Sequence, residues 1–141
     1  MDVELGPLTE KAAAALGDRR RSLPSQTAAT AEIVKMSERL RSLLAELRSR
    51  FEALYGPRLV RLVLFGSQAR GDAEPGSDID VLVVLEGPVR PGEEIRRTIN
   101  DVAGLSLENN VVFSCVFVSR DRFESGLSPL LINVRREGVP V

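Results

Sequence analysis

The sequence lacks histidine and tryptophan and contains one cysteine and one tyrosine. Without histidine, the chain cannot form a Ser-His-Asp or Cys-His relay, use imidazole as a general base or build a zinc site with imidazole ligands. Its one cysteine, Cys115, cannot form an internal disulfide and lies in an apolar stretch, so we expect a buried, unreactive thiol. Hydroxyl, carboxylate, arginine and backbone groups remain available for chemistry.

The sequence also has little net charge and no long apolar run. Its 19 Lys+Arg and 20 Asp+Glu give a formal net charge of -1, which offers no electrostatic reason to expect nucleic-acid binding. The apolar stretches are far shorter than the roughly 20 residues that span a bilayer, and the N-terminus lacks the pattern of a signal peptide. We therefore expect a cytoplasmic protein that binds small molecules or proteins rather than a membrane.

The length of 141 residues allows one hydrophobic core but no separate cofactor and substrate domains. Residues 1–28 mix Ala, Gly, Pro and Ser with an arginine cluster at 19–21 and show no sustained periodicity. We predict that they form a weakly ordered leader, with the arginine cluster as solvated surface or a contact for a partner. The folded domain is expected over residues 29–141.

A long helix is predicted over residues 29–55, because apolar side chains there recur at steps of three and four. The apolar positions are Ile33, Met36, Leu40, Leu43, Leu44, Leu47, Phe51 and Leu54. Gly56 and Pro57 would end the helix. This apolar face would either cover one side of a sheet, which we favour, or pair with a second copy through a heptad pattern.

Short apolar runs and turn residues predict the rest of the fold. Strands are expected at 59–65, at 79–85 and at roughly 111–118. Helices are expected from 91 to about 105, at 120–124 after Ser119 as N-cap, and from 129 to about 138 after Ser128. The fold class is therefore α/β (α+β), with a small mixed sheet flanked by helices.

The segment after the first predicted strand carries the chemistry. Gly66 would let the backbone turn sharply and approach a ligand, and the N–H groups that follow could cradle a phosphate beside the Ser67 hydroxyl. Arg70, one turn later, could reach a phosphate oxygen or hold Asp72 or Glu74 in place.

Two carboxylates begin the second predicted strand. Asp78 and Asp80 are two residues apart, so their side chains would point to the same face of the sheet. Carboxylates this close repel each other unless a positive charge lies between them. Mg²⁺ bound by one or two carboxylates and by substrate phosphates would supply that charge.

This combination resembles the Gly-Ser-x10-Asp-x-Asp signature of the DNA polymerase β-like nucleotidyltransferase superfamily. Gly66 and Ser67 are followed, after ten residues, by Asp78, Ile79 and Asp80. Two motifs, Gly-Ser-x-Ala-Arg-Gly and Ser-Asp-Ile-Asp-Val, resemble those of the minimal nucleotidyltransferases of bacteria and archaea. These are small proteins that are often paired with a HEPN partner. The resemblance covers residues 58–118, and 128–139 also look like the end of such proteins.

The resemblance implies the polymerase β-like fold and a role for each motif residue. Gly66 and Ser67 would contact the triphosphate, with Arg70 and Ser77 in the same nucleotide-binding set. The two aspartates would be the catalytic residues, holding one or two Mg²⁺ (or Mn²⁺) ions while an acceptor hydroxyl attacks the α-phosphorus and pyrophosphate leaves.

One expected part is missing. Active members of the family usually carry a third carboxylate on a neighbouring strand, but the corresponding strand here contains no acid. Asn110 or Ser114 would occupy that position, and neither removes a proton at neutral pH. Glu108 is our preferred substitute as base, and Glu93, Glu94 or a substrate phosphate are the alternatives.

The functional hypothesis is transfer of a nucleoside monophosphate, AMP from ATP being favoured, to a hydroxyl of a partner. By resemblance, that hydroxyl would be a tyrosine of a HEPN-type toxin. The alternative is a weak or inactive relative that binds nucleotide, or acts as an antitoxin by binding its partner. A homodimer is compatible with either hypothesis.

Overall fold

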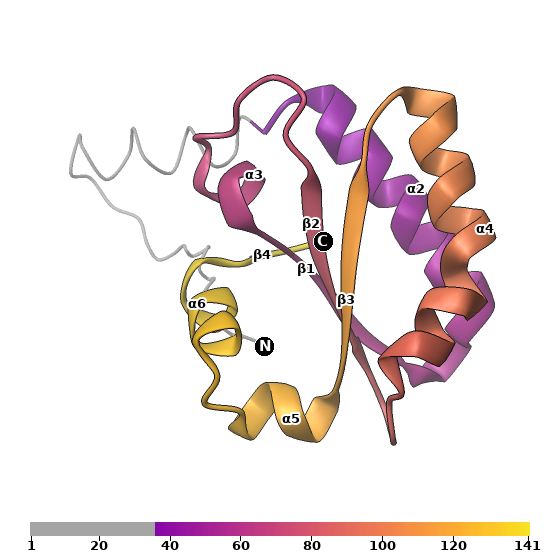
Figure 1. Cartoon of the computed structure of the whole chain (residues 1–141), viewed down its shortest axis with the longest axis vertical. Coiled ribbons are helices and arrows are strands. Elements are labelled where there is room, and N and C mark those ends of the chain that lie inside the picture. The colour runs from indigo at the N-terminus through magenta and orange to yellow at the C-terminus, as the bar shows by residue number, and fades with distance from the viewer. Residues whose placement is uncertain (1–35) are drawn as a thin grey trace. The chain divides into compact units, whose positions relative to one another are not determined.

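The computed structural model of the protein describes residues 36–141 (Figure 1). The predicted leader at 1–28, its arginine cluster and residues 29–35 of the predicted first helix lie outside the described residues. The chain divides between residues 38 and 39, and the fold below is that of residues 39–141. No helix within 36–141 is both long and apolar enough to cross a membrane.

The centre of the fold is a four-stranded sheet in the order β3-β2-β1-β4. The strands are β1 (Leu59–Phe65), β2 (Ile79–Leu85), β3 (Phe113–Ser119) and β4 (Val139–Pro140). Strand β2 pairs antiparallel with β1 and parallel with β3, and β4 pairs antiparallel with β1. The predicted mixed sheet is therefore confirmed, and β3 is one of its edges.

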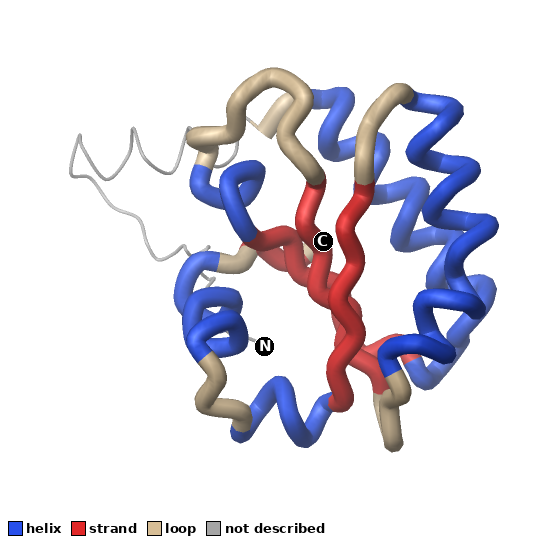
Figure 2. The backbone as a smooth tube through the Cα atoms, viewed as in Figure 1, coloured by secondary structure: helices blue, strands red, loops and turns tan. Residues whose placement is uncertain are grey.

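Helices cover both faces of the sheet (Figure 2). On one side lie α2 (Glu38–Tyr55) and α4 (Pro91–Asn109). On the other lie α3 (Gly66–Arg70), α5 (Arg120–Ser125) and α6 (Pro129–Glu137), and a single-turn 3-10 helix, η1 (Gly56–Arg58), joins α2 to β1. Each strand must therefore bury side chains on both faces, which explains its nearly continuous apolar sequence.

The core has one part on each side of the sheet. Between α2 and the sheet, Leu47 and Phe51 are fully buried, and the Phe51 ring lies 6.4 Å from that of Phe117 between centroids. On the other side Leu82 and Val84 of β2 belong to a cluster formed with α5 and α6. The apolar stripe of α2 thus covers the sheet, as favoured from the sequence, and its buried residues are not available to pair with a second copy.

Several predicted boundaries need correction. Helix α2 begins at Glu38, and the described residues Met36 and Ser37 precede it, so the helix is shorter than 29–55. Helix α4 continues to Asn109, about one turn past the predicted end near 105, because Asn110 supplies the left-handed cap, with φ of 55°. Strand β3 consequently starts at Phe113.

The two helices near the C-terminus match their predicted caps. The Ser119 hydroxyl accepts a hydrogen bond from the N–H of Arg122, and the Ser128 hydroxyl accepts one from Leu131. These bonds satisfy N–H groups that a helix start leaves unpaired. Strand β4 was not predicted, because a two-residue strand has no periodicity to detect.

Candidate active site

The candidate site is built on a row of residues that crosses the sheet. Phe65 of β1 pairs with Asp80 of β2, and Asp80 pairs with Ser114 of β3. Directly paired residues on neighbouring strands share a face of the sheet. The row therefore places the strand end that precedes Gly66, the Asp80 carboxylate and the Ser114 hydroxyl on the side covered by α3, α5 and α6.

The turn at Gly66 is in direct contact with Asp80. Gly66 has a φ of +74°, a conformation that L side chains rarely adopt, and a Cβ added there would collide with Oδ2 of Asp80. The absence of a side chain thus allows the carboxylate to lie against the backbone where β1 becomes α3. The family resemblance did not predict the contact between Gly66 and Asp80. The glycine at this position of the motif was the sequence signal that could have indicated it.

The two aspartates form an acidic pair. Burial raises the pKa of Asp80, the negative charge of Asp78 raises it further, and Arg70 opposes both effects. Asp78 is exposed, and Asp80 is half-buried. The negative charges of the two aspartates therefore favour the binding of a cation between them.

The donor set fits a hard divalent cation. The two carboxylates and the Ser114 hydroxyl are all oxygen ligands, which Mg²⁺ and Mn²⁺ prefer. Within residues 36–141 there is no group of three or more His, Cys, Asp or Glu side chains that could hold a metal. Within these residues, the candidate donors are thus the Asp80 carboxylate and Ser114 hydroxyl of the row and the Asp78 carboxylate directly before β2.

Other predicted nucleotide-binding residues lie on α3 and in the loop before β2. Ser67 and Ser77 are half-buried, and the carbonyl of Ser67 accepts the N–H groups of Gly71 and Asp72. Arg70 donates to Asp72 at 3.3 Å and forms an ion pair with Glu137 of α6 at 3.8 Å. Of the two roles considered for Arg70, the described structure has it holding Asp72, in a position from which its charge still reaches Asp80.

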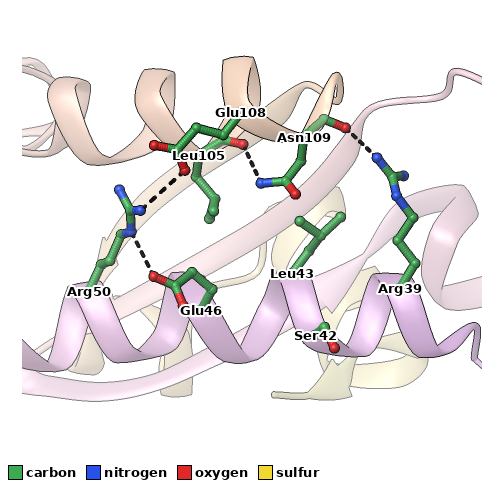
Figure 3. A pocket seen from close by; sticks show the side chains of 8 residues that line it. All are labelled: Arg39, Ser42, Leu43, Glu46, Arg50, Leu105, Glu108 and Asn109. Atoms are coloured by element: carbon green, nitrogen blue, oxygen red, sulfur yellow. Dashed lines mark hydrogen bonds and ion pairs between the residues drawn. The ribbon is translucent and has the colours of Figure 1, made fainter.

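Glu108 is placed elsewhere. It lies in the last turn of α4 and forms an ion pair with Arg50 of α2 at 3.5 Å. Both residues line a groove of about 410 Å³ between the two helices (Figure 3). The groove is on the opposite side of the sheet from the row, so the structure does not bring Glu108 together with Asp80.

The other candidates for the third ligand position or the base, Asn110, Glu93 and Glu94, differ from the acidic pair in position or in surroundings. Asn110 is exposed and caps α4 before β3 begins. Glu93 is exposed and pairs with Arg90, whereas Glu94 is 2% exposed and binds Tyr55 and two arginines. Both glutamates begin α4 after the far end of β2, whereas Asp80 lies near the start of that strand.

Cys115 points to the other face, next to the row. Burial raises the pKa of its thiol to about 12. The residue is half-buried, and its thiol stays protonated at neutral pH and is a poor nucleophile, as the sequence led us to expect.

A comparison with protein families identifies the class of protein to which this fold belongs. Residues 40–129 match the model of the nucleotidyltransferase domain, which is more than half of the chain. The chain belongs to this family. No functionally curated protein matches the sequence.

Solved structures with related folds include three that share 19% to 30% sequence identity with the chain. One, assigned as a minimal nucleotidyltransferase, is 30% identical, with a TM-score of 0.48 over 72% of this chain and 95% of that chain. A toxin-antitoxin structure with AMP-PNP is 19% identical, with a TM-score of 0.48 over 67% and 68%. A protein of Sulfolobus solfataricus, assigned as a nucleotidyltransferase, is 20% identical, with a TM-score of 0.47 over 88% and 90%.

The contact at Gly66 predicts the effect of adding one methyl group. In Gly66→Ala the new Cβ would push the Asp80 carboxylate away and strain the turn, and nucleotide affinity should fall by about 100-fold. Gly71→Ala is the matched control, because Gly71 also has a positive φ but has no atom within 4 Å of an added Cβ. Equal losses of nucleotide binding in both variants, measured by calorimetry, would show that backbone strain alone is responsible.

Proposed function

We propose that the protein is a Mg²⁺-dependent nucleotidyltransferase that transfers AMP from ATP to a hydroxyl group of a partner protein, such as a tyrosine of a HEPN-type toxin. The observation that carries the proposal is the row in which Asp80 lies against the Gly66 turn and beside Ser114. Membership of the nucleotidyltransferase family supports the reaction type. The sequence resemblance to minimal nucleotidyltransferases supports the class of partner.

Each residue of the site has a role in this proposal. Asp78 and Asp80 would hold Mg²⁺ or Mn²⁺, which when bound neutralises charge on the triphosphate. Gly66 and Ser67 would bind the phosphates through the backbone turn and the hydroxyl, and Ser77 would belong to the same nucleotide-binding set. Arg70 would give up part of its contact with Asp72 and donate instead to a phosphate oxygen.

The reaction itself is an in-line displacement. The acceptor oxygen forms a bond to the α-phosphorus while the bond to pyrophosphate breaks, and the acceptor's proton must leave. Glu108 is paired with Arg50, Glu93 with Arg90, and Glu94 with Arg58 and Arg97. We therefore favour a substrate phosphate as the proton acceptor, one of the alternatives that the sequence left open.

Labelled nucleotides test the proposal. The protein is incubated with Mg²⁺ and the purified product of the adjacent gene, in parallel reactions with ATP labelled at the α- or the γ-phosphate. Transfer of the α-label without the γ-label is the expected result. Transfer of the γ-label would indicate a kinase reaction, and no transfer of either label to partner or self would reject a transferase.

A second candidate function is nucleotide binding without efficient turnover. It is favoured by the neutral Ser114 at the position next to Asp80. Tight Mg-ATP binding without pyrophosphate release, together with inhibition of the partner that survives loss of Asp80, would distinguish this function from the first. Sedimentation at micromolar concentration would test the homodimer in either case.

We predict that the substitution Ser114→Asp increases the activity. A carboxylate there would lie beside Asp80 on the same face and complete the oxygen ligand set, so pyrophosphate release should rise by about 10-fold or more. Ser114→Asn is the control, since it has nearly the same shape as aspartate but no charge. If both variants fold and neither is faster than wild type, the missing carboxylate at this position does not limit turnover.

A further inference from the structure

The loop at residues 71–78 connects the two halves of the site. It begins after α3, with the N–H groups of Gly71 and Asp72 donating to the Ser67 carbonyl at 3.0 and 3.1 Å. It ends at Asp78, directly before β2. The position of the Asp78 carboxylate relative to the Gly66 turn therefore depends on how the end of this loop is held.

A side chain of α3 holds that end. Nε2 of Gln68 donates to the backbone carbonyl of Ser77 at 3.3 Å. The Gln68 side chain is half-buried, and its neighbour in sequence is Ser67 of the turn. One short helix thus contacts both ends of the loop: Ser67 binds the beginning and Gln68 binds the end.

The residue after Asp78 is held from the other direction. The N–H of Ile79 donates to the carbonyl of Val112, just before β3, at 2.8 Å. Asp78 therefore lies between one residue fixed by α3 and one residue fixed at the start of β3. Its own side chain is exposed, so these backbone contacts rather than side-chain packing set its position.

We propose that Gln68 is a positioning residue that anchors the Ser77 carbonyl and so fixes Asp78 at the right distance from the Gly66–Ser67 turn. The inference rests on the proposed function, since the distance matters for chemistry only if the turn and the carboxylate bind one metal-nucleotide complex. Groups that orient metal ligands typically change metal affinity by about 10- to 100-fold when they are removed. Neither the motif spacing nor the family match assigns a role to this position.

A comparison of binding with and without metal tests the inference. Gln68→Met keeps the length of the side chain and removes the donor. The control, Asn100→Met, replaces an amide by the same apolar side chain at an exposed position of α4. AMP-PNP affinity is measured for both variants and for wild type, in Mg²⁺ and in EDTA. We expect Gln68→Met to lower the affinity in Mg²⁺ by about 10-fold, to change it in EDTA by less than about 2-fold, and Asn100→Met to change neither.

A second measurement separates this inference from the proposed function. Hydrogen exchange of residues 71–79 should be faster in Gln68→Met than in wild type and unchanged in Asn100→Met. Unchanged exchange, or an equal loss of affinity with and without Mg²⁺, would overturn the role of Gln68. If wild-type protein binds no AMP-PNP, the proposed function fails, and the exchange result alone then decides whether Gln68 anchors the loop.

Discussion

Asp80→Asn should abolish transfer of the nucleotide, lowering the rate by about 1,000-fold or more, while the protein stays folded. Asparagine has nearly the same shape, so the side chain can still lie against Gly66 at the start of α3. What it loses is the negative charge that would bind the metal beside Asp78. The loss of activity would therefore report on charge and not on packing.

The same substitution should not lower the stability of the metal-free protein. Burial, and then the charge of Asp78, raise the pKa of Asp80 in the folded state, so its ionised form costs stability at neutral pH. Removing that charge relieves the cost, and we expect a Tm in EDTA equal to or above that of wild type. Such a residue lowers stability because its position serves function.

Transfer of the α-label and thermal unfolding in EDTA test both parts of this prediction. Asp121→Asn is the control, because Asp121 is an exposed aspartate in the first turn of α5. It should keep its activity. A lower Tm for Asp80→Asn with unchanged activity would contradict the role of Asp80 on both counts.

Glu94→Ala should have the largest effect on stability. Glu94 is 2% exposed, accepts a hydrogen bond from the Tyr55 hydroxyl at 2.6 Å and pairs with Arg58 at 3.1 Å and Arg97 at 3.2 Å. Removing the carboxylate leaves the buried hydroxyl unpaired and two arginines without their counter-charge. We expect a loss of roughly 3 kcal/mol, the lower end of the range for a broken buried ion pair, because both arginines remain partly exposed.

Glu93→Ala is the matched control for this change. Glu93 precedes Glu94 in the same first turn of α4, and its partner Arg90 is 80% exposed. A surface pair of this kind contributes less than about 1 kcal/mol. Urea unfolding of both variants at pH 7 measures the difference, and equal losses would show that helix-dipole effects, rather than the buried contacts, make Glu94 important.

The lowered pKa of Glu94 also predicts how the stability of the protein depends on pH. Burial alone would raise its pKa, but the hydrogen bonds from Tyr55, Arg58 and Arg97 outweigh burial and lower the pKa below its ordinary value of 4.5. A carboxyl group with a lowered pKa contributes stability above its unfolded pKa and loses it as the pH falls through the folded pKa. Below about pH 4.5, wild type should therefore lose more stability than Glu94→Gln.

The sequence predicted the elements whose causes are local. Strands β1 and β2 have the predicted bounds because an apolar run lies between turn residues at both ends. The caps at Ser119 and Ser128 were found for the same reason, since a cap and its N–H partner are three residues apart. Strand β4 was missed because its pairing with β1 determines it. The end of α4 was missed although its cap, Asn110, is local.

The residues of the candidate site also divide into those that local sequence predicted and those that depend on distant segments. The spacing of Gly66, Ser67, Asp78 and Asp80 predicted the family because one strand-turn-strand unit carries all four residues. Ser114 and Asn110 could not be ranked from the sequence, and Glu108, which the sequence favoured as the base, lies on the other side of the sheet. The register of a parallel strand depends on the crossover helix between the strands, and α4 proved about one turn longer than predicted.

Glu94 shows a further limit of sequence analysis. An acid in the first turn of a helix is usually explained by the helix dipole, and Glu93 and Glu94 look equivalent in the sequence. The partners that distinguish them, Tyr55 and Arg58, come from the end of α2 and the turn before β1. Such contacts between distant segments appear only once the chain has folded.

The location of Ser114 on an edge strand has an evolutionary consequence. The side chain at position 114 is half-buried and belongs to neither apolar cluster of the core, so exchange of serine and aspartate there leaves the scaffold intact. Under the proposed function, a lineage with this fold would be able to raise or lower its turnover rate by substitution at this single position.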